Sequence, residues 1–261
     1  MNNKRLSLIS GALSVLAVSA MVMPASAAML GSRLGLNATT SATVSLDTAA
    51  KTRADAQIQA RIAALNELQV RIGQMVKVSS DEKANLNSNI QASIGTMTNL
   101  QAKIDADTDN TTLRTDVQSI TKSYRIYVLI MPQGRITAAA DRVMTIVGLF
   151  GDLSAKLQTR ITAAQTAGQN VTALNASLAD MNSKTGDANV QAQAAIAEIA
   201  GLQPDNGDKT IFTSNQAALK DARSKIKLAM TDLKTARQDA GNIVKALISM
   251  KVTASATTTA Q

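Results

Sequence analysis

The chain lacks cysteine, histidine and tryptophan altogether, and only 2% of its 261 residues are aromatic. Without cysteine there are no disulfides, so stability has to come from packing. The missing histidine and cysteine also remove the usual general base, the commonest metal ligand and the thiol nucleophile. The 19 carboxylates form no recognisable catalytic arrangement. We therefore predict a protein that is not an enzyme and has no cofactor.

The scarcity of aromatic residues also narrows the partners. Proteins that bind single-stranded nucleic acid usually stack bases on aromatic side chains, which are nearly absent here. The formal net charge is nevertheless +8. We expect an anionic partner, either an envelope component or another protein, and no nucleic acid.

Residues 1–27 have the pattern of a cleavable secretory signal. Lys4 and Arg5 precede an apolar stretch, and Ala25-Ser26-Ala27 is a small-x-small cleavage site. The alternative is an uncleaved anchor, since about 18 apolar residues just span a bilayer. We predict cleavage, no integral membrane span afterwards, and a periplasmic, envelope-associated or extracellular location. Residues 28–45 are rich in Ser, Thr, Ala and Gly without a sustained period and are predicted to be a flexible leader.

Apolar residues in the first half recur in three seams of equal length, over 58–76, 86–104 and 113–131. Equal seams joined by short turns are typical of an antiparallel helical bundle. Ser79 with Glu82 forms a capping box for the second helix, and Asp109 can cap the third. The sequence therefore predicts a three-helix bundle over 46–131.

Three longer seams follow, over 136–167, 171–202 and 219–250, and predict a second three-helix bundle over 132–252. Arg160 breaks the fourth seam. Either Ile161 replaces it, or the arginine stem lies along the core. We expect Ser214 to cap the last helix, and residues 253–261 to be a disordered tail.

The fold class is thus all-α, with two tandem, elongated, coiled-coil-like units and six main helices. Pro132 and Gly134 separate the halves. Pro132 either kinks one long helix, giving a rod of tandem bundles, or lets the halves fold side by side. The sequence leaves both arrangements open.

Two features of the first bundle suggest buried contacts. Antiparallel stacking of its seams places Gln69, Ser93 and Tyr124 in one layer, where buried hydrogen bonds would fix the register. The stretch 124–131 is more apolar than one seam requires, so both faces of that helix are expected to be covered. Packing between the halves is the first explanation, and a ligand pocket or an oligomer contact is the alternative.

A possible metal site lies between the second and third helices. Asp105, Asp107, Asp109 and Asp116 have the spacing of a calcium-binding helix–loop–helix segment. Asn110 stands where that motif has its turn glycine, and Asp116 where it has glutamate. An acidic turn, with Asp109 as a helix cap, is the alternative.

The last helix concentrates the positive charge. Its eight cations between 215 and 251 outnumber three aspartates. A basic helix in an exported protein can dock on anionic lipid headgroups, anionic wall polymers or acidic partners. The alternative is an ordinary solvated face. The candidate surface consists of Lys220, Arg223, Lys225, Lys227, Lys234, Arg237, Lys245 and Lys251.

Several short blocks carry a resemblance. They are Ile104 to Asp109, Tyr124 to Tyr127, Pro132-Gln133, Ala140-Asp141-Arg142, Pro204 to Thr210 and Ala218 to Arg223. In these blocks the chain resembles uncharacterised secreted all-helical proteins of uncultivated, small-genome candidate-phylum bacteria. The resemblance implies an exported helical protein and adds no activity.

Together these observations predict a non-enzymatic, secreted helical bundle that acts as a structural or adhesive element at the bacterial cell envelope or surface. The alternative is a diffusible periplasmic chaperone that holds unfolded clients, which would need exposed apolar surface or a clamp-like cavity. The sequence leaves open whether the protein forms an oligomer.

Overall fold

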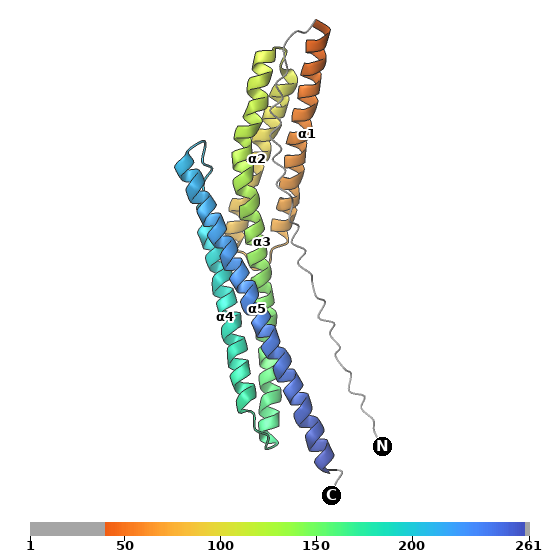
Figure 1. Ribbon diagram of the computed structural model, residues 1–261, viewed down its shortest axis with the longest axis vertical. Helices are drawn as coiled ribbons and strands as arrows, with labels where there is room; N and C mark the ends of the chain where they lie inside the picture. Colours follow the sequence, from red (N-terminus) through yellow and green to blue (C-terminus); the bar gives the residue numbers. More distant parts are fainter. Residues whose placement is uncertain (1–39, 259–261) are drawn as a thin grey trace. The chain divides into compact units, whose positions relative to one another are not determined.

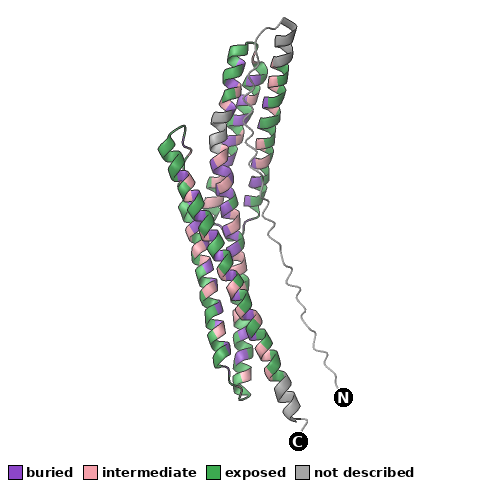
Figure 2. Ribbon diagram, viewed as in Figure 1, coloured by how far each residue is buried: buried purple, intermediate pink, exposed green. Residues whose placement is uncertain are grey.

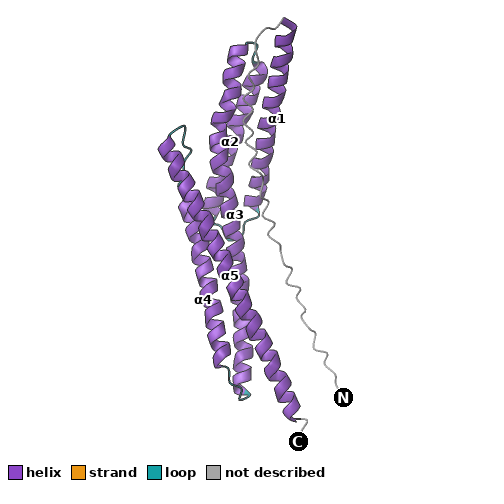
Figure 3. Ribbon diagram, in the orientation of Figure 1, coloured by secondary structure: helices purple, strands orange, loops and turns teal. Residues whose placement is uncertain are grey.

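The computed structural model describes residues 40–258, with side chains at 47–120 and 127–251. The predicted signal (1–27) and most of the predicted leader (28–45) lie outside the described residues, as does the end of the predicted tail. No strand occurs in the described part of the chain, where all the regular structure is helical (Figure 3). The all-α prediction is confirmed.

Five helices make up the described part (Figure 1). They are α1 (Thr40–Gly73), α2 (Ser80–Ala106), α3 (Asn110–Thr166), α4 (Thr172–Ala200) and α5 (Lys209–Thr258). The predicted third and fourth helices are one helix, because α3 continues through Pro132. Proline removes one backbone hydrogen bond, but residues 129–131 beside it are all buried, and this packing holds the segment in place.

The helix ends follow local chemistry. Ser79 and Glu82 form the predicted capping box, and Asp109 caps α3. Gly168, with φ of 78°, adopts the left-handed conformation that ends a helix after α3. The prediction for α5 is wrong in one detail. Asp208, not Ser214, accepts hydrogen bonds from the first backbone N–H groups, so the helix begins at Lys209.

Two helix ends lie beyond the predicted limits. Helix α1 begins at Thr40, inside the predicted leader, and α5 continues to Thr258, inside the predicted disordered tail. Extending an existing helix fixes one residue for each hydrogen bond gained, whereas starting a new helix is costly. Residues of modest helix propensity can therefore continue a long, packed helix.

The first three seams form a core between α1, α2 and the first part of α3. Gln59 bonds to Gln101, and Gln69 bonds to Gln91. Because the partner number falls as the α1 number rises, α1 and α2 are antiparallel. Val76 departs from its seam: α1 ends at Gly73, Val76 is exposed, and Met75 and Val78 are buried instead.

The last two seams pack as predicted. Every seam position from Leu174 to Ile199 and from Leu219 to Ile243 is buried, whereas many residues between these positions are exposed. Figure 2 shows this alternation of buried and exposed residues along α4 and α5. Arg160 is exposed whereas Ile161 is 1% exposed, so the local shift of the seam is the correct alternative. The core of the first half continues into the second. One buried cluster contains Ala54 of α1, Ile90 of α2, Ala188 of α4 and Leu219 of α5.

A junction centred on α3 joins the two halves. Asp141 is buried, and its Oδ1 accepts hydrogen bonds from the backbone N–H groups of Val76, Lys77 and Val78 in the turn after α1. On another side of α3, the Gln133 amide donates to the Ile199 carbonyl of α4 at 2.9 Å. Leu129, Ile130 and Met131 are three consecutive buried residues, so both faces of this segment are covered, as predicted.

Candidate functional site

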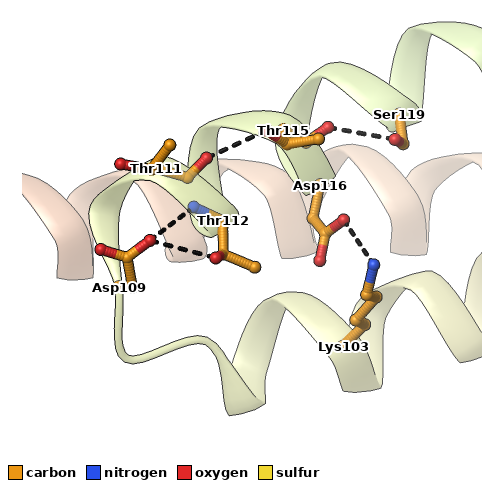
Figure 4. A network of polar contacts seen from close by, with 7 residues as sticks. All are labelled: Lys103, Asp109, Thr111, Thr112, Thr115, Asp116 and Ser119. Carbon is orange, nitrogen blue, oxygen red and sulfur yellow. Dashed lines mark hydrogen bonds and ion pairs between the residues drawn. The ribbon is translucent and has the colours of Figure 1, made fainter.

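The acidic segment between α2 and α3 does not assemble as a shared site. Asp109 Oδ2 accepts from the Thr112 N–H at 2.9 Å and from its hydroxyl at 3.0 Å (Figure 4). The Thr112 backbone N–H is the main cause that lowers the pKa of Asp109. The carboxylate therefore acts as a helix cap.

The other three aspartates of this segment make different contacts, Asp116 through its carboxylate and Asp105 and Asp107 through their backbone carbonyls. Asp116 is buried and pairs with the exposed Lys103 at 2.8 Å. This hydrogen bond is the main cause that raises the pKa of Lys103. Lys51 Nζ donates to the backbone carbonyls of Asp105 and Asp107 at 2.9 and 2.5 Å, at the end of α2. Within the described residues no group of three or more potential metal-binding side chains is found.

The structure describes two of the three side chains of the predicted polar layer, those of Gln69 and Ser93. Gln69 is half-buried and accepts from Gln91 at 2.9 Å. Ser93 is 2% exposed, and its hydroxyl has no hydrogen-bond partner. The side chain of Tyr124 lies outside the described residues. The structure thus assigns Gln69 a different partner, and the role of the tyrosine remains a prediction.

The basic surface of α5 is largely exposed. Lys220, Arg223, Lys227, Lys234 and Arg237 all face solvent, as do Lys245 and Lys251. Lys225 differs, because it contacts Asp221 and also Glu198 of α4, at 3.3 Å. The hydrogen bond with Asp221 is the main cause that raises the pKa of Lys225. We therefore remove Lys225 from the candidate surface.

Two of the three acidic residues of α5, Asp232 and Asp239, turn toward its neighbours, whereas the exposed Asp221 pairs with Lys225 of the same helix. Asp232 pairs with Lys184 of α4 at 3.4 Å. Asp239 is half-buried, and burial is the main cause that raises its pKa, followed by the charge of Asp180. Little negative charge thus remains beside the exposed cations, and α5 presents a positive face to solvent.

Exposed apolar side chains accompany these cations. Leu228 is 51% exposed, Met230 44%, Val244 37% and Ile248 60%. These apolar residues were not part of the predicted surface, although Met230 lies seven residues from both Arg223 and Arg237 and so shares their side of the helix. Large exposed apolar residues on a charged face indicate a surface that contacts something other than water.

Asp141 and Gln133 are structural residues that sequence analysis did not assign. Both appeared only inside short blocks of resemblance. Asp141 lies among buried Ala140, Val143 and Met144. An acidic residue between core positions is the sequence signal for such a role, since buried charges need partners.

No family model, curated protein or solved structure matches the chain. The resemblance to secreted proteins of candidate-phylum bacteria therefore stays a prediction. None of the helices in the described part is long and apolar enough to cross a membrane.

Proposed function

We propose that this chain is an exported, non-enzymatic helical bundle that acts as a structural or adhesive element at the bacterial cell envelope or surface. The observation that supports the proposal most is the exposed positive face of α5. Its cations are spread along one long helix, whereas the acidic residues of that helix lie against other side chains. Such a face attracts an anionic component of the envelope.

The rest of the molecule suits a scaffold that presents this face. The seam positions of α5 from Leu219 to Ile243 are buried against the other helices. This burial fixes the direction in which the side chains on the other side of α5 point. The ion pairs of Lys225 and Lys184 further fix α5 against α4. The cations are therefore held in a row on a packed support.

Cell fractionation tests the proposal. Cells expressing the native chain are separated into envelope, periplasm and medium, and the envelopes are washed at low salt and at about 1 M salt. Screening at that ionic strength shortens the reach of charges to about 3 Å. Recovery in the envelope and release by salt support the proposal. A protein that is freely soluble at low salt contradicts it.

A diffusible chaperone is the second candidate, favoured by the exposed apolar side chains Val70, Val76, Leu149 and Val190 outside α5. A chaperone of this class would suppress the aggregation of a heat-unfolded client at equimolar ratio. The light scattering of such a client, with and without the protein, separates the two functions. Suppression together with a freely soluble location favours the chaperone.

A further inference from the structure

The exposed residues of α5 include a second row with heptad spacing. Starting at Lys220, positions alternate by three and four residues up to Lys251, parallel to the buried seam one residue away. All ten positions are exposed except Gly241, which is half-buried. Ten positions over 31 residues cover about 46 Å at 1.5 Å per residue. The six cations of this α5 row are Lys220, Arg223, Lys227, Lys234, Arg237 and Lys251.

No acidic residue occupies the α5 row, and its other members are Met230, Gly241, Val244 and Ile248. The row thus combines positive charge with exposed aliphatic side chains. The first part is mostly cationic and the second part mostly apolar. A partner that fits the whole row must offer both negative charge and a less polar region.

Helix α3 contributes a second row, which sequence analysis did not identify. It consists of Arg135, Arg142, Leu149 and Lys156, at steps of seven residues. All four are exposed, Leu149 by 63%. These four positions carry three cations and one large aliphatic side chain, and the same flank of α3 also carries one exposed acidic residue, Asp152, between Leu149 and Lys156.

The contacts with α4 show where the two rows lie. On α5, Lys225 and Asp232 form ion pairs with α4, and they flank the buried seam on the side opposite to Arg223. On α3, Gln133 bonds to α4 and flanks its seam on the side opposite to Arg135. Because α3 and α5 also pack against each other, the flanks that face away from α4 border the same α3–α5 contact. The two rows therefore form one cationic and apolar face.

We infer that this α3–α5 face docks on the surface of an anionic lipid bilayer, which makes the lipid headgroups the anionic component of the proposed function on which this inference rests. A bilayer surface offers negative charge at the headgroups and, a few ångströms deeper, the apolar boundary that Met230, Leu149 and Ile248 can enter. Because α3 and α5 lie side by side, their two rows cover a wider surface than the row of one helix would.

Two other occupants fit the face less well. A hydrophilic polyanion satisfies the cations but leaves Met230, Val244 and Ile248 in water. A second copy of the chain docked by the same face would place the cations of one molecule against those of the other, because such an interface pairs identical patches. Both would leave part of the face unsatisfied.

Vesicle binding tests the inference. The probe is the protein purified from expressing cells, with its N-terminus established by intact mass. It is mixed with sedimentable vesicles of phosphatidylcholine, either pure or with about a third of phosphatidylglycerol. We expect binding to the anionic vesicles that falls with salt, and little binding to the neutral ones. Equal binding to both, or to neither, overturns the inference.

The vesicle binding of three double variants, each lacking two positive charges, shows which residues contact the bilayer. K227Q/K234Q changes the α5 row, R142Q/K156Q the α3 row, and R53Q/R114Q removes two exposed cations on α1 and the start of α3 as a control. Each basic residue near an anionic bilayer accounts for about a five-fold change in partitioning, so each face variant should bind ~25-fold more weakly. The control should change little, because distant charges are screened. An equal loss in the control overturns the inference, and an unchanged R142Q/K156Q removes α3 from the face.

An apolar substitution distinguishes a bilayer from a polyanion. I248S leaves all charges in place, so it should lower vesicle binding several-fold without changing its dependence on salt. An unchanged affinity contradicts entry into the bilayer. If anionic vesicles bind nothing while the protein is still released from envelopes by salt, the lipid inference fails and the proposed function stands. If envelope association is absent as well, both fail.

Discussion

The carboxylate of Asp141, on α3, accepts a hydrogen bond from the backbone N–H of Val76 at 2.8 Å. The same oxygen accepts from the next two backbone N–H groups, and Asp141 is only 8% exposed. A residue from the second half of the chain thus satisfies the backbone of the turn that joins the first two helices. These hydrogen bonds therefore link the turn between α1 and α2 to the second part of α3.

Removal of this carboxylate should destabilise the fold strongly. In D141A three backbone N–H groups lose their acceptor, one in a buried and two in part-buried hydrogen bonds, so we expect a loss of about 3 kcal/mol in the free energy of unfolding. D141N keeps one acceptor oxygen and should cost less. The exposed Asp152 on the same helix provides the control D152N. Urea unfolding measures all three, and a D141A as stable as D152N would contradict the role of Asp141.

Gly134 sets the distance between α3 and α1. A Cβ placed on Gly134 would lie 2.6 Å from two carbons of Leu68, whose side chain is itself buried. G134A should therefore destabilise the protein by about 1 to 3 kcal/mol through overpacking. G151A is the matched substitution in the same helix, with nothing within 4 Å. It should stabilise by about 0.5 to 1 kcal/mol, because alanine favours the helix. Chemical unfolding that gave both variants the same sign would refute the close contact.

Ile161 carries the seam of α3 past Arg160. Ile161 is 1% exposed, so I161A should lower the free energy of unfolding by about 3 kcal/mol. The neighbouring substitution R160A removes an exposed side chain and should have an effect below about 0.5 kcal/mol. Thermal unfolding of the pair measures the difference. A reversed order would show that the arginine position belongs to the core.

Asp239 should make stability depend on pH in an unusual direction for an aspartate. Burial and the nearby Asp180 raise its pKa in the folded chain above the ordinary value of 3.8. Folding therefore takes up a proton between the two pKa values, and the contribution of Asp239 to stability falls as the pH rises through that window. D239N should stabilise the protein at pH 7, and the gain should shrink as the pH approaches 3.8.

The control for this prediction is D152N, which removes an exposed aspartate on α3. Melting temperatures of D239N, D152N and the wild type are compared at pH 7 and at pH values down to about 4, just above the ordinary aspartate pKa. A D239N that is less stable than the wild type at pH 7 would show that the carboxylate has a favourable partner there.

The seams predicted the core well because a heptad pattern needs only the sequence and the helix period. Leu178 and Ala188 lie in the seam predicted over 171–202 and Ala229 in the seam predicted over 219–250, and all three are buried. Val76 failed because its seam was continued beyond the residue at which α1 ends. Local caps with short reach, such as Ser79 and Asp109, were also predictable.

The long-range relationships were not predictable in the same way. Asp141 lies 65 residues from Val76 in the chain, and no periodic pattern relates them. The same holds for the candidate site. The α5 cations were visible in the sequence, but the contact that removes Lys225 and the α3 row that extends the face depend on which helix flanks meet. The four aspartates at 105–116 matched a motif by spacing, yet Asp109 caps α3 and Asp116 pairs with Lys103.

We propose that the positive face of α5 holds the protein at an anionic envelope. The most direct measurement is fractionation of cells that express the wild type, K227Q/K234Q or R53Q/R114Q at equal levels, with quantitative blotting of envelope and soluble fractions. We expect the wild type and R53Q/R114Q to stay with the envelope at low salt and K227Q/K234Q to shift to the soluble fraction. An unchanged envelope fraction for K227Q/K234Q, with its melting temperature intact, would contradict the proposal.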